Sequence, residues 1–178
     1  MKKILMTMAA MLVTMTMSAQ MYVGGEVGFS SVSYDGNSTS TINIRPEVGY
    51  VLDDNWGLGI MIGYGQSGKG NSKLTTLTVN PYARYTFAKF DRVNLFLDGG
   101  FTFTNIDSKS AGYKTNVFSV GVKPGVAVNL NDKISFVSHL GFLGYKNSKP
   151  DHDGAKATNT VSFDIDASNV TFGLYYNF

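Results

Sequence analysis

The sequence predicts an all-β protein that crosses a membrane as a closed, antiparallel, up-and-down β-barrel of about eight strands. Three observations support this prediction. Apolar residues recur at every second position along most of the chain, tight and long connections alternate between the apolar segments, and the opposite strand faces combine many of the 20 glycines with a few charged residues. The 178 residues suffice for one domain, and the absence of cysteine excludes disulfides and thiolate metal sites.

Residues 1–19 have the layout of a secretory signal peptide, which leaves residues 20–178 as the barrel domain. Two lysines form the basic start, and the apolar stretch 4–17 is shorter than the roughly 20 residues that a transmembrane helix needs. Met17 is larger than the residue usual before a cleavage site, so a retained N-terminal anchor stays open as an alternative. Of the 15 basic residues, 13 remain after the signal peptide and balance the 13 acidic ones, so the charge suggests no nucleic-acid partner.

Segments with a two-residue apolar period are the predicted strands. Val23, Val27 and Phe29 share one face of the first segment, and Trp56 and Ile60 share one face of the third. We expect strands near residues 22–33, 41–52, 56–66, 74–87, 92–105, 115–130, 134–146 and 160–178. The tight connections are 53–55, 88–91 and 131–132, and the longer ones are 34–40, 67–73, 106–114 and 147–159.

A weak internal repeat supports the number of strands. Four segments align without gaps, with apolar residues at alternate positions and a final Leu or Phe: PEVGYVL (46–52), PYARYTF (81–87), PGVAVNL (124–130) and FGLYYNF (172–178). If these are four strands that descend toward the tight connections, their ascending partners complete a barrel of about eight. Chance similarity stays open as the alternative.

The orientation of the two strand faces separates a membrane barrel from a soluble one. A soluble up-and-down barrel, such as a lipocalin, turns its bulky apolar face inward and needs a polar exterior, which the glycine-rich face of residues 57–65 does not supply. Aromatic residues gather at strand ends, as in interfacial girdles: Tyr50, Trp56, Tyr85, Phe87, Tyr176 and Phe178 at one end, with Tyr64 and Phe103 nearer the other. We therefore expect the apolar face to meet lipid.

Charged residues in the middle of the strands are predicted to point into the lumen. They are Glu26, Arg45, Glu47, Arg84, Asp98 and Lys123, with His139 as a further polar member. Isolated charges in a narrow lumen are costly to desolvate, whereas a bonded network satisfies them. We expect such a network to fill and rigidify the barrel; a gated or narrow path for solutes is the alternative.

The end of the chain and two strand–turn segments resemble one family. VTFGLYYNF (170–178) is similar to the C-terminal assembly signal of outer-membrane proteins, in which Phe172, Leu174, Tyr176 and Phe178 occupy alternate positions. NPYARYTF (80–87) and KPGVAVNLNDKISF (123–136) resemble segments of the small OmpX-like and opacity-like outer-membrane barrels, and the SAQ cleavage region resembles that of Bacteroidetes members. The resemblance implies insertion into the cell outer membrane by the barrel-assembly machinery, with the short turns in the periplasm.

Three segments imitate functional motifs. Residues 63–70 nearly match a phosphate-binding loop but lack its Ser or Thr and the helix that follows it. Ser138 and His139 are neighbours on a strand and face opposite sides of the sheet, so they do not form a nucleophile–base pair. The Asp-His-Asp segment 151–153 is more typical of a solvated loop than of a metal site. We predict no catalytic, cofactor or metal site.

These features predict an integral outer-membrane barrel that is not an enzyme and has a structural or interaction role. Loops diverge and determine what is recognised, so we expect the extracellular loops to contact a ligand or surface partner that the sequence does not identify. We further expect a monomer that contacts outer-membrane lipid. Two alternatives stay open: a narrow porin-like channel, which needs a wet path that such a small barrel barely allows, and a lipid-modifying enzyme, which needs a catalytic constellation.

Overall fold

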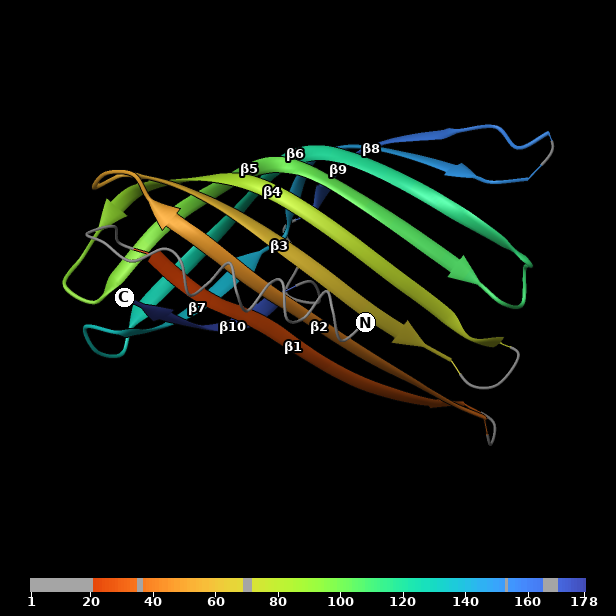
Figure 1. Cartoon of the computed structure of the whole chain (residues 1–178), viewed down its shortest axis with the longest axis horizontal. Coiled ribbons are helices and arrows are strands. Elements are labelled where there is room, and N and C mark those ends of the chain that lie inside the picture. The colour runs from red at the N-terminus through yellow and green to blue at the C-terminus, as the bar shows by residue number, and fades with distance from the viewer. Residues whose placement is uncertain (1–20, 35–36, 69–71, 153, 165–169) are drawn as a thin grey trace.

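The computed structural model describes residues 21–34, 37–68, 72–152, 154–164 and 170–178. The predicted signal peptide lies outside these residues. The described strands form one antiparallel sheet that curls into the barrel of Figure 1. In chain order they are β1 (Met21–Tyr34), β2 (Asn37–Val51), β3 (Trp56–Ser67), β4 (Leu74–Lys89), β5 (Val93–Ser108), β6 (Tyr113–Asn129), β7 (Ile134–Leu140), β8 (Phe142–Pro150), β9 (Thr158–Asp164) and β10 (Val170–Asn177).

The sheet closes into a ring whose members are β1 to β7 and β10. Each of β1 to β7 pairs with its neighbour in the chain, β10 pairs with β7, and β1 pairs with β10 to complete the ring. β8 pairs with the part of β6 that β7 leaves free, and β9 pairs with β8. Among the described residues, eight strands therefore surround the lumen. This confirms the predicted closed, antiparallel barrel of about eight strands.

The structure divides two predicted strands and lengthens several hairpins. The predicted strand 134–146 is interrupted at Gly141, whose φ of 93° lies in the left-handed region that favours glycine. The predicted strand 160–178 corresponds to β9 and β10. The hairpin of β5 and β6 reaches Ser108 and Tyr113, beyond the predicted strand limits. Most of the added residues are polar (Asp107, Ser108 and Lys114), which is why the apolar sequence pattern ends earlier than the ladder.

The two ends of the barrel differ in their connections. We call the end with the short connections the turn end and the opposite end the loop end. At the turn end the β1–β10 pairing runs from Tyr22 with Asn177 to Glu26 with Gly173. Beyond Glu26, the pairing of β1 within the described part of the chain is with β2. The β8–β9 hairpin and the outer ends of β1 and β2 diverge toward the loop end in Figure 1.

The turn between β2 and β3 is held by a side chain. Asp53 Oδ1 accepts hydrogen bonds from the backbone N–H groups of Asn55 and Trp56, both at 2.8 Å. These bonds favour the carboxylate and hold the pKa of Asp53 below its ordinary value. The carboxylate therefore stabilises this turn at pH values above its ordinary pKa, and the contribution is lost as the pH falls.

Large apolar side chains cover the outside of the barrel. Exposed outward residues include Ile44, Leu58, Ile60, Leu77, Phe101 and Leu174. The inward face instead holds charged residues, tyrosines and glycines, so the pattern is that of a barrel whose exterior meets lipid. This arrangement excludes the soluble, lipocalin-like alternative. The described residues contain no helix long and apolar enough to cross a membrane, an observation that does not bear on strands.

Glycines on the inward face make room for aromatic rings in the lumen. A Cβ atom on Gly49 would lie 2.1 Å from Tyr22 Cζ, and one on Gly59 would lie 2.3 Å from Tyr82 Cζ. Such approaches are far inside van der Waals contact. The lumen glycines therefore allow large side chains to cross the interior of a narrow barrel.

Candidate functional site

Arg84 lies at the centre of the charged lumen. Its Nε and one terminal nitrogen each donate to a different oxygen of Asp98 at 2.7 Å, and that nitrogen also lies 3.6 Å from Glu47 Oε1. The guanidinium carbon lies 4.0 Å from the centre of the Phe96 ring. Arg84 and Asp98 are direct partners in the β4–β5 ladder, so the strand register itself forms this bidentate pair.

His139 connects this pair to a second carboxylate. Its Nε2 lies 2.8 Å from Asp98 Oδ2, and its Nδ1 lies 3.1 Å from Glu26 Oε1. An ionised carboxylate only accepts hydrogen bonds, so this geometry favours an imidazolium that donates from both ring nitrogens. Glu26 also accepts from Thr171 at 2.6 Å and pairs with Arg45 at 3.3 Å.

Three tyrosines that the sequence analysis missed complete the network. The hydroxyl groups of Tyr82 and Tyr175 both donate to Glu47, the latter at 2.8 Å, and the hydroxyl oxygens of Tyr22 and Tyr82 are 2.6 Å apart. A usable signal was present. Tyr22 and Tyr82 have the same strand parity as the predicted lumen charges Glu26 and Arg84, and Tyr175 alternates with the predicted outward residues of its strand. The predicted aromatic girdle contains outward tyrosines alone.

These side chains close the lumen near the turn end. We call the set Tyr22, Glu47, Tyr82, Arg84, Phe96, Asp98 and Tyr175 the plug. Its members are among the most buried of the chain: Phe96 is 1% exposed, Tyr175 3% and Asp98 5%. On the turn-end side of the plug, the Ser135 hydroxyl donates a hydrogen bond to Asn129 at 2.8 Å and accepts one from Asn177 at 2.9 Å. The interior is therefore filled with mutually bonded side chains at this level.

The structure places Lys123 apart from the carboxylates, unlike the expected network. Lys123 is the ladder partner of Asp98, but its ammonium donates instead to Asn80 Oδ1 at 3.0 Å. Arg84 and His139 already occupy both oxygens of Asp98. Among the described residues Lys123 therefore has an uncharged hydrogen-bond partner and forms no ion pair.

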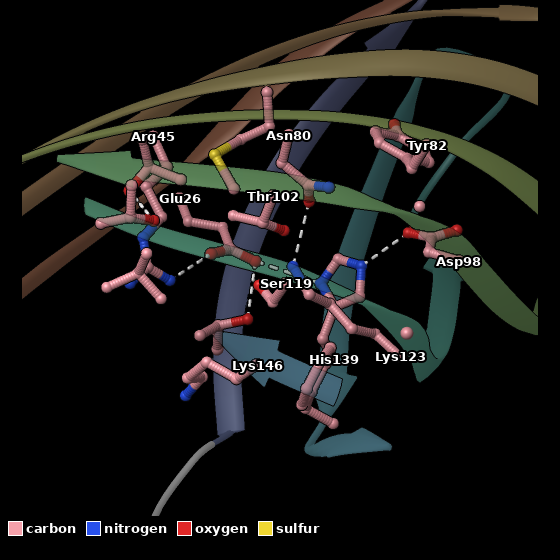
Figure 2. A pocket seen from close by; sticks show the side chains of 18 of the residues that line it. Glu26, Arg45, Asn80, Tyr82, Asp98, Thr102, Ser119, Lys123, His139 and Lys146 are labelled. Atoms are coloured by element: carbon pink, nitrogen blue, oxygen red, sulfur yellow. Dashed lines mark hydrogen bonds and ion pairs between the residues drawn. The ribbon is translucent and has the colours of Figure 1, made fainter. Parts of the chain in front are cut away.

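Toward the loop end the lumen widens into a cavity of about 540 Å³. Glu26, His139 and Lys123 lie at its inner end, where Figure 2 shows them beside one another. Thr76 and Ile106 line it near its outer end, two residues from the loop-end limits of β4 and β5. The plug thus separates this cavity from the turn end.

The structure describes parts of the three segments that resemble functional motifs. Ser138 Oγ is buried and has no hydrogen-bond partner, whereas His139 is bonded on the inward face, so the two do not act together. Residues 69–70 of the glycine-rich segment and Asp153 of the loop segment lie outside the described residues. Within those that are described, no group of three or more His, Asp or Glu residues could hold a metal ion.

The predicted assembly signal lies on the outward face of β10, with Phe178 directly after the strand. Phe172, Leu174, Tyr176 and Phe178 are exposed by 57%, 59%, 39% and 73%, so all four side chains are available to lipid or to another protein. The backbone N–H of Phe178 donates to Met21 O at 2.9 Å, which ties the end of the chain to the start of β1. The role of these residues in assembly stays a prediction.

The variant Phe178→Ser is expected to lower the yield of folded barrel in cells severalfold while export continues, because the terminal aromatic is lost and the backbone bond is kept. The measurement is the heat-modifiable band of outer-membrane fractions on a gel. Leu130→Ser is the matched control, since Leu130 is also an exposed apolar residue at the turn end. Normal yield of the Phe178 variant would contradict the prediction.

Comparisons with known proteins agree with this architecture. Residues 4–178 match the family model described as "outer membrane protein beta-barrel domain". The structure is similar to neisserial surface protein A (NspA; 15% identity, TM-score 0.52, covering 91% of this chain and 100% of that one). It is also similar to the N-terminal β-barrel domain of Pseudomonas aeruginosa OprF (11%, 0.52, 90% and 100%) and to P. aeruginosa OprG (14%, 0.50, 90% and 94%). At such identities these likenesses concern the fold alone, and comparison with curated proteins found no match.

Proposed function

This chain belongs to the family of outer membrane protein beta-barrel domains, and from that premise we propose that it is a non-enzymatic barrel, closed to solute flow, that interacts with its surroundings through its outer end. It lies in the bacterial outer membrane, as the family and the fold require. In this orientation the turn end faces the periplasm and the loop end faces the outside.

The plug is the observation that supports closure most directly. The side chains of Arg84 and Asp98 are only 13% and 5% exposed, and each has an ionic partner that would have to leave before water could pass. Glu47, 6% exposed, receives two tyrosine hydroxyl groups in addition to Arg84. Because every charge in the plug is bonded, opening it would leave buried charges unpaired, which is costly.

The hydrogen bonds of His139 support a non-enzymatic function. Both of its ring nitrogens are bonded to carboxylates, so neither is available as a general base. Ser138 lies on the opposite face of β7. The lipid-modifying alternative therefore has no nucleophile–base pair at the only Ser–His pair adjacent in the sequence.

In planar bilayers the purified protein is expected to show no steady unitary conductance, because the plug leaves no continuous water path. Replacing Tyr82 and Tyr175 together with alanine should open one and produce discrete conductance steps. Tyr85 and Tyr176 are the matched controls, since both point outward, and their double alanine variant should stay silent.

Two results would contradict the proposal. Steady conductance of the unaltered protein would favour the narrow channel. A change in lipid A mass in cells that express the protein, absent when His139 is replaced with glutamine, would favour the enzyme.

A further inference from the structure

The cavity on the outer side of the plug has the composition of a binding site. We propose that it binds a phosphorylated sugar, either free or as the headgroup of a lipid. This inference rests on the closed lumen of the proposed function, because a floor formed by the plug would retain a solute that an open channel would pass.

Positive charge is in excess at this cavity. Four cationic side chains line it, Arg45, Lys123, Lys146 and the His139 imidazolium, against the three carboxylates of Glu26, Glu47 and Asp98. Of these carboxylates, Glu26 lies on the same wall as Arg45 and is not part of the plug. This carboxylate already accepts from His139, Thr171 and Arg45. Counted over the lumen network in the described residues, the cations Arg45, Arg84, Lys123 and His139 outnumber the carboxylates Glu26, Glu47 and Asp98. An added anion would restore the balance.

Lys123 is held in position to meet such an anion. The β4–β5 pairing is interrupted at Asn80 and Pro81, since proline has no N–H to donate. Asn80 Nδ2 fills the gap by donating to the carbonyl of Phe101 at 2.7 Å and that of Pro81 at 3.3 Å. Its Oδ1 is thereby fixed toward Lys123 (Figure 2). An ammonium has three donors, so Lys123 keeps further donors for a ligand after bonding to Asn80.

The remaining wall favours a sugar as the carrier of the anion. Hydroxyl side chains line it from the middle to the outer end, namely Thr76, Thr78, Thr102, Thr104 and Ser119. Hydroxyl groups both donate and accept, as the hydroxyls of a sugar do. A volume of about 540 Å³ is in the range of small-molecule sites. A phosphorylated monosaccharide thus matches the cavity in charge, polarity and size.

We expect a ligand to enter this cavity from one of two sides. Thr76 and Ile106 place its outer end close to the loop end, through which a free sugar phosphate would enter. Glu26 and Thr171 line it on the side where the β1–β10 pairing stops, which faces the outer leaflet. A lipid with a phosphorylated sugar headgroup would reach the same cations from that side. The chemistry that is recognised is the same for both sources.

The test uses the folded full-length barrel in a non-ionic detergent. Binding of glucose 6-phosphate, glucose and lipid A is measured by native mass spectrometry, with calorimetry for the soluble compounds. Lys123→Met and Lys146→Met remove one cavity cation each, and Lys149→Met removes a lysine from the opposite face of β8. Lys146 is exposed, whereas Lys123 is bonded to Asn80, so the Lys146 variant keeps the test valid if Lys123→Met fails to fold.

We expect glucose 6-phosphate or lipid A to bind, and each cavity variant to weaken binding about tenfold or more, as for a lost charge-assisted hydrogen bond. Lys149→Met should not weaken binding. Glucose, which has no phosphate group, should not bind. Binding of the sugar phosphate alone identifies a soluble ligand, and binding of lipid A alone identifies the lipid. The proposal is overturned if neither binds or if Lys149→Met weakens binding equally. A conducting barrel that still binds the ligand would refute closure and leave the site intact.

Discussion

Replacing Arg84 with alanine is expected to lower the free energy of unfolding by about 3–5 kcal/mol, because the change leaves buried carboxylates without their cation. Asp98 would lose two hydrogen bonds of 2.7 Å, and Glu47 would lose its ion pair. The Phe96 ring would also lose the guanidinium that packs on it. Denaturant unfolding in detergent micelles, followed by circular dichroism, measures the difference.

Two further variants show whether the loss comes from unpaired charge. Lys156→Ala removes an exposed lysine and should change the free energy of unfolding by no more than about 0.5 kcal/mol. Arg84→Met combined with Asp98→Asn removes both charges and should cost less than Arg84→Ala alone, since it leaves a smaller buried charge. Equal stability of Arg84→Ala and the unaltered barrel would refute a stabilising charge network in the plug.

A lysine in place of Ile60 is expected to lower the free energy of unfolding by roughly 2–4 kcal/mol in a lipid bilayer, because it puts a charge at the middle of the membrane. Ile60 is 39% exposed and points outward from β3. It lies midway along the strand between Trp56 and Tyr64, the outward aromatic residues at the two interfaces. Folding titrations into lipid vesicles measure the cost.

Depth is the variable that this experiment isolates. Leu52→Lys puts the same charge on an outward, 52% exposed residue beyond the turn-end aromatics, where the cost should be about 0–1 kcal/mol. Comparable losses for the two variants would show that Ile60 is not near the midplane. No loss at either position would contradict the lipid-facing exterior.

Strand alternation predicted the lining of the lumen well, because a strand residue faces one side or the other according to its parity alone. Arg84 and Asp98 were both placed inside on this ground, and the ladder brings them opposite one another. Tyr22 and Tyr175 obey the same parity, so their place in the plug was within reach of the sequence. The outward position of Phe172 and Leu174 also follows from it.

The choice of partner within the lumen could not be predicted, because it depends on side chains from strands distant in the sequence. Register alone would pair Lys123 with Asp98, but both oxygens of that carboxylate are bonded to Arg84 or His139. The break at Gly141, which separates β7 from β8, was also beyond the sequence, since many of the other glycines lie within strands.

The length of the β5–β6 hairpin has a consequence for the outer surface of the cell. Strands of 16 and 17 residues, tilted as usual for membrane barrels, span about 40 Å along the barrel axis, whereas the apolar band is about 25 Å tall. The excess projects from the loop end as a stiff ribbon, braced by an Asn105–Asn116 hydrogen bond of 2.7 Å. A large molecule that approaches this end would therefore meet a projecting hairpin. Its tip at residues 109–111 can vary in sequence, whereas Gly112, with a φ of 73°, is required by the turn.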